Sequence, residues 1–294
     1  MAIVATGFFD GVHSGHRSII SKMASIARER QEEAIVVTFW PHPRTVLQQD
    51  ADRLRLLNSI EEKKALCIAA GADRVAVLPF SKNFSRICAA DFLRMYLVER
   101  FGATAIVLGS DHRLGCDRIE SSETMAETIR ACGLEPVFVD DSLTTDGQPV
   151  SSTLIRNALS CGDIALANSM LGYGYTLLGV VVAGNRIGRT IGFPTANMEL
   201  YDPLKLVPAR GVYRVGVEVQ GVRHAGICNI GCRPTVADNR GRTIETHILD
   251  FNEDIYGLDI SLTFIDRIRD ERQFDSLDAL KAQLEEDRRM TLSL

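Results

Sequence analysis

The spacing of apolar residues changes near residue 172, and this change is the strongest constraint on the fold. Up to that point, short apolar runs alternate with stretches in which apolar residues recur at helical spacing. Beyond it, short strand-like runs follow one another, separated by Gly, Pro and Asn. A chain of 294 residues is long enough for two domains. We therefore predict a doubly wound parallel α/β domain over residues 1–172, and a small antiparallel β-barrel with a C-terminal helix over residues 173–294.

Individual elements follow from the same spacing. In the first part, strands are predicted over residues 2–6, 34–40, 74–80, 103–109 and 135–140. Helices are predicted from about Ser14 to Arg30, from the capping box of Ser59 and Glu62 to Gly71, over Ala90–Phe101, and as two short helices over 151–172. In the second part, strands are predicted within 176–184, 211–219, 225–231, 244–251 and 259–265, with a hairpin turn at 220–221 and a last helix starting near Ser276.

Charge and cysteine usage exclude several classes of protein. The net charge is −5, from 38 acidic and 33 basic residues, which argues against a general nucleic-acid-binding surface. The longest apolar runs are far shorter than the roughly 20 residues that span a bilayer. No basic segment precedes the first apolar run, so we expect no signal peptide. Seven scattered cysteines lack the spacing of a zinc site, so we expect free thiols and a cytoplasmic protein.

The run GFFDGVHSGH, residues 7–16, connects the first predicted strand to the first predicted helix. Backbone N–H groups at the start of a helix are unpaired, and the helix dipole adds positive potential there, so the place suits a phosphate. His13 and His16 are three residues apart and share a face of the first turn. Imidazoles there can donate hydrogen bonds to a phosphate in a transition state. The alternatives are a metal site, which lacks an obvious third ligand, and a surface pair with no role.

This run resembles the Gly-x-Phe-Asp-Gly-x-His-x-Gly-His signature of nucleotidyltransferases, which the residues Gly7, Asp10, Gly11, His13 and His16 match. The resemblance implies that the histidines stabilise the phosphates of a nucleoside triphosphate. A second phosphate-binding segment is implied by SSTLIR, in which Ser151, Ser152 and Thr153 supply hydroxyls and Arg156 supplies a planar cation. The stretch GSDHRLGCDR keeps the family's Gly109 and Asp111. The departures from the family pattern are Phe8, Trp40, His112 and Leu114, which bear on flavin or adenine affinity.

The second part carries a longer signature. The run GNRIGRTIGFPTAN, residues 184–197, resembles riboflavin kinases, and the resemblance continues in order to about residue 288. Its glycines and arginines form a flexible cationic loop that can approach a nucleotide; the residues are Gly184, Arg186, Gly188, Arg189 and Gly192. Thr195 and Asn197 offer neutral oxygens, which suit Mg²⁺ held largely by phosphates and water, and the resemblance implies that they are its ligands. Without the longer run, the PTAN segment is equally well explained as an ordinary turn.

Glu245 is the candidate general base. If the strand runs to residue 251, Glu245 shares a face with His247, Leu249 and Phe251, and burial on that face would raise its pKa. The family's catalytic base occupies this position; the alternative is a salt bridge at the rim. The resemblance also implies a place for Arg269 near the flavin and ATP.

Taken over its full length, the sequence resembles the bacterial bifunctional riboflavin kinase/FAD synthetase family. This resemblance implies phosphorylation of riboflavin by ATP, followed by adenylylation of FMN by a second ATP, with Mg²⁺ and without nucleic-acid or membrane partners. Two alternatives remain open. One is a nucleotidyltransferase for another phosphorylated acceptor, with the barrel as an accessory. The other is a flavin-binding module whose transferase site has lapsed. The sequence leaves the oligomeric state open.

Overall fold

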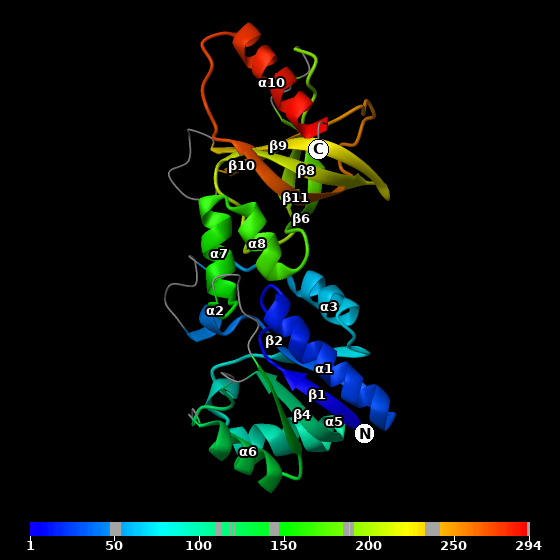
Figure 1. Cartoon of the computed structure of the whole chain (residues 1–294), viewed down its shortest axis with the longest axis vertical. Coiled ribbons are helices and arrows are strands. Elements are labelled where there is room, and N and C mark those ends of the chain that lie inside the picture. The colour runs from blue at the N-terminus through cyan, green and yellow to red at the C-terminus, as the bar shows by residue number, and fades with distance from the viewer. Residues whose placement is uncertain are drawn as a thin grey trace. The chain divides into compact units, whose positions relative to one another are not determined.

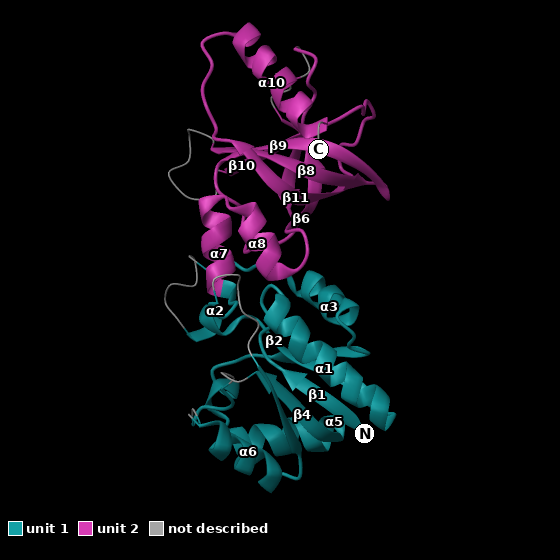
Figure 2. Ribbon diagram, in the orientation of Figure 1, with its two compact units in different colours: residues 1–152 teal, residues 153–294 magenta. Residues whose placement is uncertain are grey.

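The computed structural model describes residues 1–47, 54–109, 113–117, 119, 121–140, 147–184, 188, 191–232 and 242–292. The chain divides into two compact units, residues 1–152 and residues 153–294, which are coloured separately in Figure 2. The predicted boundary between an α/β domain of residues 1–172 and a barrel domain of residues 173–294 stays a prediction.

The first unit is built on a parallel sheet of five strands (Figure 1). The strands are β1 (Ala2–Thr6), β2 (Glu33–Trp40), β3 (Arg74–Pro79), β4 (Ala103–Gly109) and β5 (Glu135–Val139). Their order in the sheet is β3-β2-β1-β4-β5, and every neighbouring pair is parallel. All five predicted strands are therefore confirmed, as is the doubly wound α/β class.

Helices cover both faces of this sheet. They are α1 (Ser14–Arg30), α2 (Pro43–Leu47), α3 (Ile60–Ala69), α4 (Ala89–Asp91), the π-helical segment η3 (Phe92–Val98), α5 (Glu99–Phe101) and α6 (Ser122–Ala131), with a 3₁₀ turn at Phe84–Arg86. Strand β1 shows the two-sided burial: Ile3 packs in one core with Met23 of α1, and Val4 packs in the other with Leu93 of η3. Ile3 and Val4 point to opposite faces of the sheet, and both are buried because crossover helices cover both faces.

Local capping explains where α3 begins. The Ser59 hydroxyl accepts a hydrogen bond from the Glu62 amide at 3.2 Å, and the Glu62 carboxylate accepts one from the Ser59 amide at 2.6 Å. This is the predicted capping box, and it satisfies two amides that a helix start leaves unpaired. The predicted helix over residues 90–101 is also present, but its middle, Phe92–Val98, is π-helical.

The second unit is a closed antiparallel barrel with the strand order β10-β7-β6-β11-β8-β9 (Figure 1). The strands are β6 (Thr176–Val182), β7 (Ala196–Leu200), β8 (Gly211–Val219), β9 (Val222–Cys232), β10 (Arg242–Ile248) and β11 (Asp259–Arg269). The predicted hairpin is confirmed, because Gln220 and Gly221 both have positive φ between β8 and β9. The sequence pattern does not predict β7, which is short and carries Asn and Glu between its apolar residues.

Two short helices, α7 (Ser152–Cys161) and α8 (Ile164–Leu171), lead into the barrel, and α10 (Leu277–Leu292) follows it. The break between α7 and α8 is the predicted one: Gly162 has φ 83°, and the Asp163 carboxylate caps α8 by accepting from Leu166 N at 3.0 Å. The Asn168 side chain of α8 then joins the barrel, donating to Phe264 O at 2.9 Å and accepting from Tyr175 N at 2.8 Å. These helices are therefore packed as part of the second unit.

Candidate active sites

The loop after β1 has a strained backbone. Phe9, Gly11 and Val12 have φ values of 47°, 84° and 36°, in the left-handed region that favours glycine. A β-branched residue such as Val12 is rarely found there, and here its side chain is fully buried and its amide donates to Phe9 O at 3.2 Å. Strained non-glycine residues of this kind cluster at functional sites, where the surrounding structure holds them in place.

The two histidines follow this loop directly and lie together. His13 is the N-cap residue of α1, and its ring stacks on that of His16 with centroids 3.6 Å apart and planes 21° apart. The edge of Phe9 meets His16 at 5.2 Å. His13 is buried and His16 is half-buried. The two imidazoles are thus held side by side at the N-terminus of a 17-residue helix, where the helix dipole favours an anion.

Buried polar side chains concentrate around the same loop. Among the described residues of the first unit, the buried polar or charged side chains are Thr6, Asp10, His13, Thr38, Asn58 and Lys63. Thr6 ends β1, and Thr38 lies near the end of β2, so the carboxyl edge of the parallel sheet carries them. Open α/β sheets bind ligands at this edge. The sequence pattern singles out only Asp10 and His13 of this set.

Asp10 connects the loop to two distant segments. Its carboxylate Oδ1 accepts a hydrogen bond from Leu57 N at 3.0 Å, and its backbone carbonyl accepts one from the Ser152 hydroxyl at 2.7 Å. The structure therefore brings Ser152, and with it the half-buried Ser151, to the loop that precedes the histidines. Thr153 and Arg156 lie on α7.

The other predicted binding residues of this unit lie at the same sheet edge or outside the description. Gly7 follows β1 and donates its amide to Val37 O at 3.1 Å, and Gly109 ends β4 beside Val139 of β5. Asp111 and His112 lie outside the described residues. The departure Phe8 has its ring 5.1 Å from Phe39 and 5.5 Å from His42, and Leu114 is buried. Trp40, the last residue of β2, is half-buried.

In the second unit, strand register gathers a row of polar side chains. Glu245 of β10 is opposite Asn197 of β7 on one side and opposite Asn229 of β9 on the other. Directly opposite residues of antiparallel strands point to the same face, so the three side chains are neighbours. All three are half-buried. Glu245 and Asn197 are predicted site residues; Asn229 is not, although the alternation of buried Cys228 and Ile230 marks it as facing the other way.

The glycine-rich segment approaches the same strand. A Cβ on Gly184 would lie 2.2 Å from Nδ2 of Asn197, and one on Gly188 would lie 2.2 Å from Phe193 O and 3.7 Å from Cγ2 of Thr195. A side chain at position 184 would require the Asn197 side chain to move. Gly192 has φ 86°. Arg186 and Arg189 lie outside the described residues.

Thr195 lines a cavity of about 70 Å³ in the second unit. Its walls are Val181, Pro194, Thr195, Ala196, Thr246, Ile248 and the segment 251–256. Thr246 and Ile248 alternate with Glu245 and His247 along β10, so Glu245 faces away from this cavity. The structure thus brings Glu245 and Asn197 together on one face of the strands, and Thr195, two residues before Asn197, lines the cavity.

The strand that carries Glu245 is shorter than predicted. β10 ends at Ile248, and the chain turns at Asp250, which has φ 52°. The expectation that Leu249 and Phe251 continue the face of Glu245 is therefore wrong. Leu249 instead packs in a small apolar cluster with Val212 and Ile227. The Glu245 side chain is half-buried rather than enclosed by apolar residues.

His247 is the titratable neighbour on the Glu245 face. Its Nδ1 lies 2.8 Å from Pro194 O, and since a carbonyl only accepts, Nδ1 carries the proton. Its ring meets Phe193 at 5.1 Å. Burial lowers the pKa of His247, opposed in part by the bond to Pro194 O; Arg288 lowers this pKa further and Asp250 raises it.

This lowered pKa predicts a pH dependence of stability. Because the pKa of His247 is lower in the folded chain than in the unfolded chain, the unfolded chain binds more protons as the pH falls through about 6.5. Stability contributed by neutral His247 is therefore lost as the pH falls from 7 to 5. Urea midpoints of the second unit, followed by circular dichroism in the full-length chain, should fall less steeply in His247→Gln than in the parent. Parallel pH profiles would contradict the prediction.

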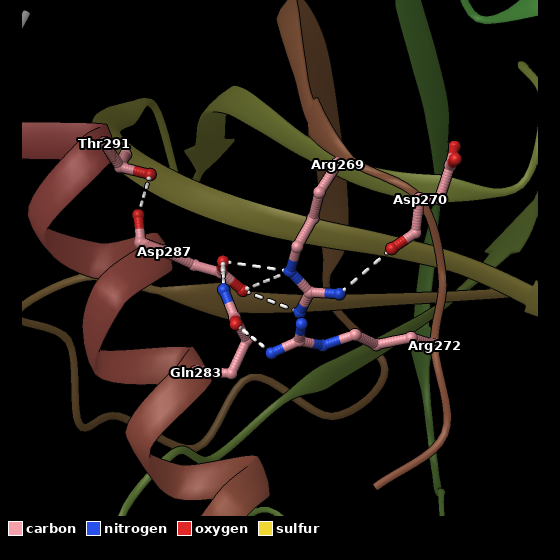
Figure 3. A network of polar contacts seen from close by, with 6 residues as sticks. All are labelled: Arg269, Asp270, Arg272, Gln283, Asp287 and Thr291. Carbon is pink, nitrogen blue, oxygen red and sulfur yellow. Dashed lines mark hydrogen bonds and ion pairs between the residues drawn. The ribbon is translucent and has the colours of Figure 1, made fainter.

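Arg269 is held by the C-terminal helix (Figure 3). Its Nε lies 3.0 and 3.2 Å from the carboxylate oxygens of Asp287, its Nη2 lies 2.7 Å from Oδ2, and its Nη1 donates to Asp270 O at 3.1 Å. Asp287 is fully buried, and Gln283 donates to it at 2.8 Å while accepting from Arg272. Arg269 thus docks α10 on the barrel. Its implied place near flavin and ATP stays a prediction.

The described part of the chain contains no group of three or more His, Cys, Asp and Glu that could hold a metal ion. All seven cysteines are free thiols. No described helix has both the length and the apolar character needed to cross a membrane.

Comparison with known proteins gives a consistent result for both units. Residues 1–154 match the family model described as FAD synthetase, and residues 171–294 match the one described as riboflavin kinase. The bifunctional riboflavin kinase/FMN adenylyltransferase of Bacillus subtilis is 36% identical over 289 residues, covering 98% of this chain and 90% of that protein. The Escherichia coli K12 protein of the same name is also 36% identical, covering 97% and 90%.

Among solved structures, a crystal structure described as a macrolide-efflux protein from Streptococcus pneumoniae is similar to the whole chain. The TM-score is 0.91 at 33% identity, covering 100% of this chain and 94% of that one. A parallel α/β unit with a histidine pair at its sheet edge, joined to a closed barrel with a glycine-rich loop, is consistent with a two-part transferase. The chain belongs to the bifunctional riboflavin kinase/FMN adenylyltransferase family.

Proposed function

We propose that this chain converts riboflavin to FMN and then FMN to FAD. In the second unit, the γ-phosphate of ATP passes to the ribityl 5′-hydroxyl of riboflavin, giving FMN and ADP. In the first unit, the FMN phosphate attacks the α-phosphate of a second ATP, giving FAD and pyrophosphate. The observation that carries the proposal is that both family models match in order along one chain, each with its own cluster of polar residues in the structure. ATP is the donor in both steps.

In the first unit, the chemistry needs stabilisation of phosphate charge more than proton transfer, because the nucleophile is already an anionic phosphate. The stacked imidazoles of His13 and His16 supply hydrogen-bond donors at the start of α1. The Ser152 hydroxyl reaches the same loop, where it donates to Asp10 O, and Ser151 precedes it in the chain. Gly7, Gly11 and Gly109 keep the backbone close to the nucleotide. The family resemblance adds Thr153, Arg156 and Asp111 as phosphate- or nucleotide-binding residues.

In the second unit, we propose that Glu245 accepts the ribityl proton as general base. The residues around it fit Mg²⁺: the Asn197 amide lies beside Glu245 with Gly184 against it, and neutral oxygens from Asn197 and Thr195 suit a cation that keeps phosphate and water ligands. When bound, Mg²⁺ neutralises phosphate charge. Gly188, Arg189 and Gly192 belong to the loop that approaches the nucleotide, and the cavity beside Thr195 is our candidate for part of that nucleotide's site.

Chromatography of flavins after incubation with riboflavin, ATP and Mg²⁺ tests the proposal. The expected result is FMN first and FAD later, with ADP and pyrophosphate. A chain that forms FMN but adenylylates a different phosphorylated acceptor would support the alternative nucleotidyltransferase. Flavin binding without turnover would support a binding module. We further propose a cytoplasmic setting, because all seven cysteines are free thiols, as in proteins of reducing compartments.

The two units should work independently. A fragment of residues 173–294 should still form FMN from riboflavin, and so should a fragment of residues 153–294. The longer fragment should melt about 5 °C higher, because it keeps the Asn168 bonds to Phe264 O and Tyr175 N and the bond from Ala209 N to Leu159 O. Calorimetry and the flavin assay check both points. A folded fragment of either length without kinase activity would contradict the prediction.

A further inference from the structure

Lys63 is a buried amine close to the candidate site of the first unit. It lies in the first turn of α3, where its amide donates to Ser59 O at 3.0 Å, and only 3% of the residue is exposed. On the same buried face of α3, one turn later, lies Cys67. Lysine is almost never buried to this degree without a compensating charge. Its neighbour Lys64, in contrast, projects into solvent and pairs with Glu61 at 2.8 Å.

The group that favours the charged form of Lys63 is the buried carboxyl of Asp10, which accepts from Leu57 N two residues before the N-cap of the same helix. Burial lowers the pKa of Lys63, while Asp10 acts in the opposite direction by favouring the charged amine. Burial also raises the pKa of the Cys67 thiol to about 12, so this neighbour stays neutral at pH 7. Asp10 is therefore the carboxyl group that favours the charged form of the buried lysine.

Asp10 in turn holds the loop that leads to the histidines. It lies between Phe9 and Gly11, two of the three residues with positive φ. Its side chain accepts from Leu57 N, only two residues before the N-cap of α3, and its backbone carbonyl accepts from Ser152. The start of α3 therefore interacts with the loop in two ways: through the hydrogen bond from Leu57 N to Asp10 and through the charge of Lys63.

We propose that Lys63 is a positioning residue for adenylyl transfer: its ammonium balances the buried Asp10 carboxylate and thereby holds the strained loop and the His13–His16 pair in the phosphate-binding conformation. This role rests on the proposed function of the first unit. Lys63 is enclosed by protein, so it acts through Asp10 and not by touching the substrate. Nothing in the sequence pattern singles it out from Lys64.

The test compares Lys63→Met with the matched control Lys64→Met in the full-length chain, with FMN, ATP and Mg²⁺ as substrates and FAD as the measured product. We expect Lys63→Met to lower kcat for FAD formation about 10²-fold, as small displacements of catalytic groups do. Lys64→Met should stay within threefold of the parent. Riboflavin phosphorylation, measured on the same preparations, should be unchanged in both. A parent that forms no FAD would refute the proposed function itself, whereas a Lys63→Met variant within threefold of an active parent would refute the role of Lys63.

Two further variants separate positioning from mere packing. Lys63→Arg keeps the charge and should form FAD at least tenfold faster than Lys63→Met. Equal loss of activity in both variants would overturn the proposal. Asp10→Asn removes the charged partner of Lys63. Adding Lys63→Met to Asp10→Asn should therefore lower the rate of FAD formation by less than a further threefold, because the buried charge that needs balancing is gone. This double variant also stays informative if Lys63→Met alone unfolds the first unit. Losses that multiply in the double variant would show that Lys63 does not act through Asp10.

Discussion

Replacing both His13 and His16 with alanine should abolish FAD formation from FMN while leaving FMN formation from riboflavin nearly intact. Because the two rings stack at 3.6 Å at the start of α1, both are placed to donate to the same phosphate group. The double variant removes both donors. Removing one preorganised donor to a transition-state anion typically costs about 10²- to 10³-fold in rate. We therefore expect the double variant to lose at least about 10³-fold. Separate assays starting from riboflavin and from FMN measure the two steps.

The kinase step of the same preparation serves as the control, because its proposed residues lie in the other unit. Equal collapse of both steps would contradict the assignment of the histidines to adenylyl transfer. Metal analysis tests the rival explanation of the pair. Stoichiometric zinc in the purified chain, lost on the same substitutions, would show that the histidines bind a metal and not a phosphate.

The second large effect is expected at Glu245. Glu245→Gln keeps the size of the side chain and its place opposite Asn197 and Asn229, but an amide cannot accept the ribityl proton. General-base assistance contributes typically about 10²- to 10⁴-fold, and we expect riboflavin phosphorylation to fall by a factor in that range. Conversion of supplied FMN to FAD should be nearly unchanged. Initial rates of the two half-reactions on one preparation provide the measurement.

A matched control is available on the neighbouring strand. Glu199 lies two residues beyond Asn197 on β7 and is exposed, so Glu199→Gln removes a carboxylate from the barrel without touching the row at Glu245. Its kinase activity should stay within a few-fold of the parent. If Glu245→Gln behaves like this control, Glu245 is not the base.

Much of the fold could be predicted from the sequence, because the signals that specify it are local. The three central strands of the first unit, β1, β2 and β4, follow from continuous apolar runs, which are typical of strands buried on both faces. The capping box of Ser59 and Glu62 acts within one turn, and the hairpin at residues 220–221 acts within two residues. The predictions differ from the structure where the apolar pattern does not mark an element or its end. β10 stops at Ile248 although the apolar pattern continues, and β7 carries too few apolar residues to be recognised.

The candidate sites divide in the same way. The sequence by itself determined the histidine pair, the serines at the start of α7 and the glycine-rich run, because each motif is contiguous and its geometry follows from a helix start or a flexible loop. Only the tertiary structure decided that Asn229 is opposite Glu245, that Asp287 holds Arg269, and that Lys63 and not Lys64 is buried beside Asp10. Strand register, helix docking and burial depend on residues far apart in the chain, and no local pattern encodes which of two adjacent lysines faces the core.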